Sequence, residues 1–120
     1  MMFKYYNINP EHLRISDCVC RAISLATDTD YHDVMQILQE NADDNQCDCL
    51  KLECYSKMID DIGYERHSAE GKTVQQISEE NKDKTVIIRI EGHLTCSRSG
   101  DVYDIWDCTK KTADVFWIVD

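Results

Sequence analysis

The sequence at residues 85–96 reads TVIIRIEGHLTC, and this stretch decides the fold that we predict. Val and Ile dominate residues 85–90, a pattern typical of a buried β-strand. We expect the same strand to continue past Gly92 and to end at about Cys96. A turn rich in Ser and Gly and two further strands follow. These segments are the turn at 97–100, a returning strand at 102–106 and a last strand at 115–119. The C-terminal part of the chain therefore predicts an antiparallel sheet.

Helices precede this sheet in the sequence. In three stretches the apolar residues recur at the i, i+3, i+4, i+7 spacing of an amphipathic helix. Ser16 or Asp17 is a suitable N-cap for the first helix, Gly63 closes the third, and a capping box begins a fourth. The elements are helices from about Cys18 to the TDTD run at 27–30, from Tyr31 to about Asn41 and from Leu52 to Ile62, a short strand at 64–67, and a helix from Thr73 to about Glu80. This order predicts an α+β fold whose helices cover one face of the sheet.

Length, composition and charge limit the possible functions. The chain has 120 residues, 42% hydrophobic and 30% charged, with four Gly and one Pro, so we expect one folded domain over 1–120 and no disordered tail. The net charge of −10 argues against binding to nucleic acid or to an anionic membrane. A basic protein partner is compatible with this charge.

We expect the protein to reside in the cytoplasm. Charged and polar side chains interrupt the N-terminal residues, so these form neither the apolar core of a signal peptide nor a membrane-spanning helix. In a reducing compartment the seven Cys should be mostly free thiols. One residue separates Cys47 from Cys49, with Cys54 close behind, whereas paired zinc thiolates are commonly separated by two to four residues. We therefore expect no metal and no cofactor.

Cys18 is the residue best placed for nucleophilic chemistry. It lies where a loop meets the first turn of a predicted helix, and the unsatisfied N–H groups and the helix dipole there lower the pKa of a thiol. A thiol nucleophile also needs an imidazole that accepts its proton and a third group that orients the imidazole. His93, beside Gly92 in the buried stretch, is the best base in the sequence.

Two carboxylates compete for the third position. Asp107 orients His93 if its strand ends just beyond the level of His93, and a turn that differs by one residue gives that place to Asp104. Other residues near these positions have structural interpretations. We expect Arg21 to form an ion pair, and Trp106 and Trp117 to pack in the core.

Three short motifs follow one another along the chain: DCVCRAIS at 17–24, GHLT at 92–95 and YDIWD at 103–107. In this order they resemble small papain-like cysteine-peptidase-like proteins of phages and bacteria, which are distant relatives of the bacteriocin-leader peptidases. The resemblance implies a minimal papain-like fold with Cys18 as nucleophile and His93 as base. Asp107 falls on the usual third member, and Asp104 is the neighbouring acid.

The same resemblance implies an oxyanion hole made of the backbone N–H of the nucleophile and a side-chain donor shortly before it, typically Gln. No Gln stands there in this sequence. The polar residues that can replace it are Asn7, Asn9, His12 and Ser16.

The resemblance implies a cysteine-dependent hydrolase or acyl transferase that acts on an amide or thioester bond of a peptide or protein. The acidic surface favours a basic substrate. The alternative is an acidic phage-type protein that catalyses nothing and inhibits a basic host protein by mimicking nucleic acid.

Overall fold

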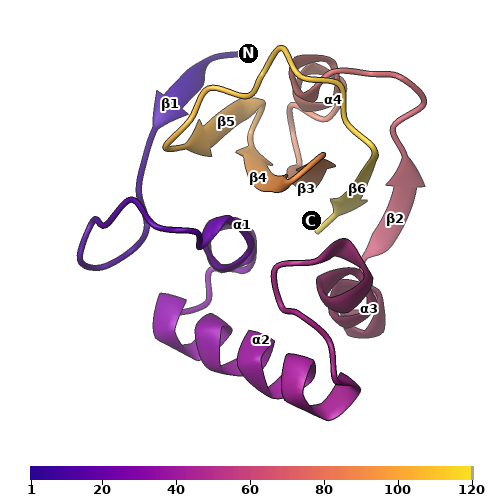
Figure 1. The fold of residues 1–120 in the computed structure, drawn as a ribbon. Coiled ribbons are helices and arrows are strands. Elements are labelled where there is room, and N and C mark those ends of the chain that lie inside the picture. The colour runs from indigo at the N-terminus through magenta and orange to yellow at the C-terminus, as the bar shows by residue number, and fades with distance from the viewer. Residues whose placement is uncertain (120) are drawn as a thin grey trace.

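The structure is a computed structural model that describes residues 1–119. Within this part of the chain, four helices and six strands make an α+β fold (Figure 1). Their bounds in chain order are β1 Phe3–Tyr5, α1 Cys18–Thr27, α2 Tyr31–Asn45, α3 Leu52–Ile62, β2 Glu65–Ser68, α4 Val74–Glu80, β3 Thr85–Ile90, β4 His93–Arg98, β5 Asp101–Asp104 and β6 Val115–Ile118.

The strands form one sheet in the order β1-β5-β4-β3-β6-β2. The β4–β5, β3–β4, β3–β6 and β2–β6 pairs are antiparallel, but β1 runs parallel to β5, with Lys4 opposite Tyr103. The C-terminal strands β3 to β6 are antiparallel as predicted, but the added N-terminal strand makes the sheet mixed. The missed strand, β1, has only three residues, too few for a period of two to be recognised in the sequence.

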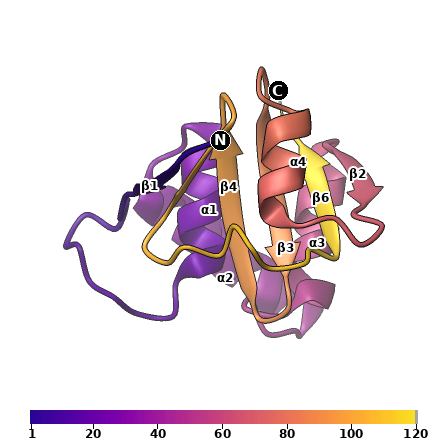
Figure 2. The ribbon, with the colours of Figure 1, turned by 90° about the horizontal axis from the view of Figure 1, so that it is seen from above.

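The stretch at 85–96 is a hairpin and not the single strand that the sequence predicted. β3 and β4 are joined by a tight turn at Glu91 and Gly92 (Figure 2), and Ile90 lies opposite His93. Gly92 has a φ of +73°, a left-handed conformation that glycine adopts without steric cost. The turn makes His93 the first residue of β4, so its side chain lies at one end of the sheet.

Helices cover both faces of the sheet, whereas the sequence predicted that one face would be covered. Figure 1 shows α1, α2 and α3 below the sheet and α4 above it. The lower core packs α1, α2 and α3 against Ile87, Leu94 and Trp117, and the upper core packs α4 against Val86 and Ile88. Alternate residues of β3 thus enter opposite cores, as the period of two in a strand requires.

The helices follow the predicted pattern with two differences. α3 ends at Gly63 and α4 begins with a Thr73–Gln76 capping box, as expected. α2 continues four residues beyond the predicted Asn41, because residues 42–45 contain no Gly or Pro and three of the four are polar and exposed. Asp17 occupies the N-cap position of α1, but its carboxylate makes no capping hydrogen bond.

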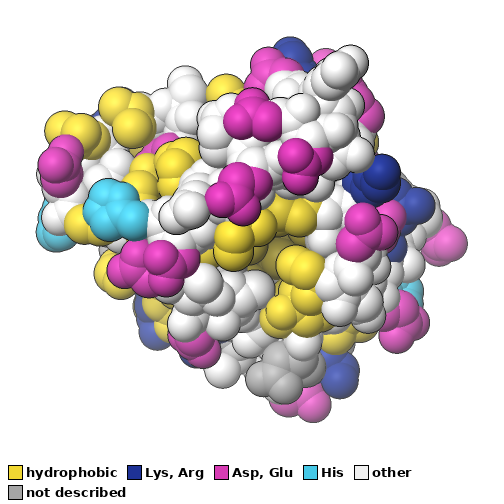
Figure 3. Space-filling model, turned by 90° about the horizontal axis from the view of Figure 1, so that it is seen from below, with side chains coloured by type: hydrophobic (Ala, Val, Ile, Leu, Met, Phe, Trp, Pro, Cys, Tyr) yellow, Lys and Arg dark blue, Asp and Glu magenta, His cyan; other side chains and the backbone are white. Residues whose placement is uncertain are grey.

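The surface below the sheet is acidic. α2 carries exposed Asp33, Glu40, Asp43 and Asp44 and contains no Lys or Arg. Figure 3 shows this face of the molecule, on which acidic side chains surround a hollow that contains hydrophobic side chains. Among residues 1–119, no helix has both the length and the apolar character needed to cross a bilayer.

Candidate active site

Cys18 is the first residue of α1 and is half-buried. Burial by itself raises the pKa of its thiol. Hydrogen bonds with the His93 side chain and the Leu94 backbone, together with the positive charges of His93 and Arg21, outweigh the burial, so the pKa of Cys18 lies below its ordinary value. The N–H groups of the first helical turn have no acceptor within the helix and favour negative charge at this point. This environment favours the thiolate.

His93 connects the thiol to a carboxylate. Its Nε2 lies 2.6 Å from Oδ2 of Asp104, so Nδ1 is the ring nitrogen that remains for Cys18. Burial lowers the pKa of His93, but hydrogen bonds with Asp104, Cys108 and Cys18 raise it to about 11. A cationic His93 beside an anionic Cys18 is the charge state that both pKa directions favour. The edge of Trp106 packs against the imidazole, with the ring centroids 5.0 Å apart.

Asp104, the last residue of β5, is the acid that reaches His93. It is 2% exposed, and its Oδ1 accepts hydrogen bonds from the Ile105 backbone N–H at 2.7 Å and from Nη1 of Arg21 at 2.9 Å. Burial raises the pKa of Asp104, but the hydrogen bond and charge of His93 and the hydrogen bond from Arg21 hold it below its usual range. The carboxylate therefore stays ionised.

Asp107 takes no part in this arrangement. Its Oδ1 accepts hydrogen bonds from the backbone N–H of Thr109 at 3.1 Å and from the Thr109 hydroxyl at 2.6 Å. β5 ends at Asp104, three residues earlier than Asp107, so Asp107 belongs to the following loop. Of the two acids between which the sequence left a choice, the structure brings Asp104 to His93 and leaves Asp107 as a turn residue.

Arg21 links the site to the loop before α1. Its Nε donates to Oδ1 of Asp17 at 2.7 Å, while Nη1 donates to Asp104, and all three side chains are buried. Asp17 also accepts hydrogen bonds from the Tyr31 hydroxyl at 2.7 Å and from Nδ2 of Asn9 at 3.1 Å. The expected ion pair of Arg21 is present, and it is shared between two carboxylates.

Existing hydrogen bonds already occupy two of the four expected oxyanion donors. Nδ2 of Asn9 is committed to Asp17, and Nδ2 of Asn7 donates to the Leu13 carbonyl at 2.8 Å. His12 is exposed and does not line the cleft that contains Cys18. Ser16 does line that cleft, two residues before the nucleophile. Ser16 is therefore the candidate that remains.

The cleft holds both Cys18 and His93 and has a volume of about 660 Å³. Its apolar walls come from three segments: Ile15 precedes α1, Leu50 lies between α2 and α3, and Trp106 follows β5. Trp106 is 44% exposed, so the expectation that it packs in the core was wrong. Trp117 is fully buried, as expected, and its Nε1 donates to Asp60 at 2.9 Å. The exposure of Trp106 follows from its place beyond the end of β5.

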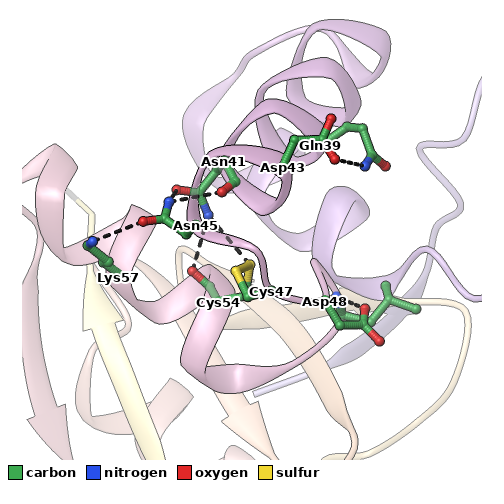
Figure 4. The surroundings of a disulfide bond; sticks show 9 residues. Gln39, Asn41, Asp43, Asn45, Cys47, Asp48, Cys54 and Lys57 are labelled. Carbon is green, nitrogen blue, oxygen red and sulfur yellow. Dashed lines mark hydrogen bonds between the residues drawn. A yellow bond between two sulfur atoms is a disulfide. The ribbon is translucent and has the colours of Figure 1, made fainter.

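The cysteines in residues 1–119 are mostly free thiols, as expected, with one pair as the exception. Cys47 and Cys54 form a disulfide (Figure 4), so these two are oxidised and are not zinc ligands. The free thiols in residues 1–119 are Cys18, Cys20, Cys49, Cys96 and Cys108. Burial raises the pKa of both Cys20 and Cys96 to about 12, which keeps these two protonated.

Within residues 1–119, one group of side chains offers metal-ligating atoms. Ligand atoms of His93, Asp104 and Cys108 lie within 4.8 Å of one another. A nitrogen, a carboxylate oxygen and a sulfur are donors that zinc accepts. Arg21 and His93 already balance the negative charge of Asp104, so protein groups alone satisfy this carboxylate. The sequence did not link Cys108 to His93, because only the folded chain brings these two side chains together.

Comparison with protein-family models, with curated proteins and with solved structures found no match to this chain.

Proposed function

We propose that the protein is a cysteine-dependent hydrolase or acyl transferase that acts on an amide or thioester bond. The observation that carries this proposal is that Cys18 and His93 line the same cleft, with His93 held at 2.6 Å by the buried Asp104. A thiolate, a base held in one orientation and room for a substrate are the requirements of thiol acyl-transfer chemistry.

In the first step, Sγ of Cys18 attacks the carbonyl carbon of the substrate and a C–S bond forms. The proton on His93 moves to the leaving amine or thiol as the scissile C–N or C–S bond breaks. An acyl group then remains on Cys18 as a thioester. Asp104 holds the imidazole in place and stabilises its cationic form, as the third member does in such sites.

In the second step, His93 removes a proton from the acceptor, which attacks the thioester carbonyl and releases Cys18. Water as acceptor gives hydrolysis, whereas an amine or alcohol gives transfer. The negative charge that develops on the carbonyl oxygen falls near the first N–H groups of α1, and Ser16 is the side chain available to add a hydrogen bond. The papain-like resemblance of the three motifs agrees with these roles for Cys18 and His93.

A peptide or protein is the substrate class that the cleft favours. Ile15, Leu50 and Trp106 offer apolar surface to the cleft. Its charged lining has both signs, with Glu53 and Glu91 beside Arg21, Lys51 and Arg89. An extended peptide with an apolar residue near the scissile bond complements this lining. The overall charge of −10 adds a long-range attraction for a basic substrate.

Acylation by phenyl thioacetate tests the reaction class without knowledge of the natural substrate. We expect the acetyl group to appear first on Cys18, detected by peptide mapping under denaturing acidic conditions, and to appear more slowly in His93→Ala. Cys49, which is half-buried and free, is the internal control. Equal acetylation of Cys18 and Cys49 in the wild-type protein would refute the proposal.

A second candidate function rests on the acidic face of α2. Its exposed carboxylates, without any Lys or Arg in the helix, suit a non-catalytic protein that binds a basic host factor in place of nucleic acid. Replacing Asp33, Glu40 and Asp44 with Lys abolishes partner binding under this alternative, and Cys18→Ala leaves it intact. Under the enzymatic proposal, Cys18→Ala is the variant that loses function.

A further inference from the structure

The Cys47–Cys54 disulfide closes a ring of chain around one wall of the cleft. Leu50, Lys51, Leu52 and Glu53 all line the cleft, and all lie between the two cysteines. Elsewhere in the described residues, the cleft is lined by the segment before α1 and the start of α1, by the β3–β4 hairpin and by the loop after β5. The α2–α3 connection therefore meets the cleft only through residues that the disulfide encloses.

Both ends of this ring are fixed to the helices. Cys47 follows the left-handed Gln46 that ends α2, and its N–H donates to the Ala42 carbonyl at 3.0 Å. Cys54 lies in the first turn of α3, where its carbonyl accepts a hydrogen bond from Nδ2 of Asn41 at 3.2 Å. Figure 4 shows Asn41 reaching from α2 toward Cys54 beside the disulfide.

Within the ring, residues 52–54 belong to the first turn of α3, and the Lys51 carbonyl accepts hydrogen bonds from the N–H groups of Cys54 and Tyr55 at 3.0 and 3.2 Å. Before this turn, Asp48 accepts hydrogen bonds from the Leu50 and Lys51 N–H groups, each at 2.9 Å, and Cys49 packs partly against the lower core. Leu50 is exposed and lies outside both helices. The position of Leu50 relative to Cys18 thus depends on the covalent closure of the ring.

We propose that segment 47–54 is a specificity-determining wall of the cleft and that the Cys47–Cys54 disulfide switches it between a fixed and a loose form. This inference rests on the proposed function of Cys18. A dithiol reductant converts the disulfide into two thiols, adding two electrons and two protons, and is itself oxidised to a disulfide. The loose wall binds an extended substrate more weakly, while the thiolate of Cys18, held by His93 and α1, is unchanged.

Two alkylating reagents of different size separate these effects. Iodoacetamide reports only the reactivity of Cys18, and benzyloxycarbonyl-Phe-Ala fluoromethyl ketone must also occupy the cleft. In Cys47→Ser/Cys54→Ser we expect the inhibition constant of the ketone to rise about tenfold, comparable to the loss of one apolar contact in a pocket. We expect the iodoacetamide rate at Cys18 to stay the same. Cys49→Ser, which removes a thiol from within the ring and keeps the disulfide, is the matched control.

A second pair of variants keeps the test independent of the stability of the double variant. Leu50→Asp changes the wall with the disulfide intact, and we expect the same loss of ketone affinity. Ile37→Asp is its control, because Ile37 is 47% exposed against 46% for Leu50 but lies on α2 outside the cleft. Unchanged ketone affinity in both Leu50→Asp and the folded double variant would overturn the inference.

The two reagents also distinguish this failure from failure of the proposed function. A wild-type Cys18 that reacts with iodoacetamide no faster than Cys49 removes the proposed function and this inference with it. Fast, His93-dependent reaction of Cys18 combined with unchanged ketone affinity removes the role of the ring alone.

Discussion

Replacing Arg21 with Met would leave two buried carboxylates without their shared guanidinium. Arg21 is 7% exposed, and Asp17 and Asp104 are each 2% exposed. Removal of one partner from a buried ion pair costs about 3–5 kcal/mol, because the remaining charge is desolvated and uncompensated. Each carboxylate keeps other donors, Tyr31 for Asp17 and His93 for Asp104, so the cost should not double.

We therefore expect Arg21→Met to lower the free energy of unfolding by about 4 kcal/mol at pH 7, or the Tm by about 15 °C. Urea denaturation followed by circular dichroism measures this difference. Arg98→Met is the control, because the ion pair of Arg98 with Asp28 lies at the surface and should contribute about 1 kcal/mol or less. Equal destabilisation by the two substitutions would refute the idea that the Arg21 network holds the site together.

The pH dependence provides a second check on Arg21→Met. Asp104 has a depressed pKa in the folded protein, so its contribution to stability is present above its ordinary value of 3.8 and is lost as the pH falls through the folded value. Without Arg21 the folded pKa of Asp104 rises and this contribution shrinks. The stability gap between wild type and Arg21→Met should therefore stay the same from about pH 7 to about pH 4 and narrow as the pH falls below 3.8. A gap that stays constant below pH 3.8 as well would show that charge on Asp104 is not involved.

Two further predictions concern the acid and the cleft. Asp104→Asn should slow iodoacetamide alkylation of Cys18 at about pH 6 by at least about tenfold, whereas Asp107→Asn should leave the rate unchanged. An equal effect of the two substitutions would contradict the assignment of Asp104 as the acid that orients His93. Ile15→Asp should weaken inactivation by benzyloxycarbonyl-Phe-Ala fluoromethyl ketone by about tenfold, and Ile62→Asp, similarly exposed but outside the cleft, should have no effect. Loss of inactivation in both variants would indicate a general change of charge.

Local features made most of the helices predictable. The starts of α1 and α2 follow from apolar spacing after capping residues, and α3 ends at Gly63 because a left-handed residue there closes a helix. The capping box of α4 is likewise a signal within four residues. These features act between neighbours in the sequence, so they do not depend on the rest of the fold.

The sheet edges and the hairpin could not be predicted in the same way. β1 is held by β5 from the other end of the chain, and its three residues have no pattern of their own. The turn at Glu91 and Gly92 could not be recognised within residues 85–96, because buried residues lie on both sides of it and the stretch resembles one continuous strand. Pairing with a distant segment decided β1, whereas the β3–β4 hairpin pairs neighbouring segments across a two-residue turn.

The nucleophile and the base of the candidate site could be predicted from the sequence. Which acid contacts the base, and which cysteines pair, could not. Cys18 and His93 follow from their places at a helix start and in a buried stretch. The choice of Asp104 over Asp107 depended on where β5 ends, a matter of a few residues in register. The Cys47–Cys54 disulfide depended on how α2 and α3 meet, which the spacing of the cysteines does not reveal.

The pH dependence of Cys18 alkylation by iodoacetamide, followed by mass spectrometry on the folded protein, is the direct test of a Cys18–His93 pair. We expect Cys18 to react faster than the other free thiols below about pH 7, and His93→Ala to move its reaction to higher pH. His93→Ala removes the hydrogen bond and positive charge that lower the pKa of the thiol. A Cys18 that reacts no faster than Cys49 in the wild-type protein, or whose profile is the same in His93→Ala, would contradict the account.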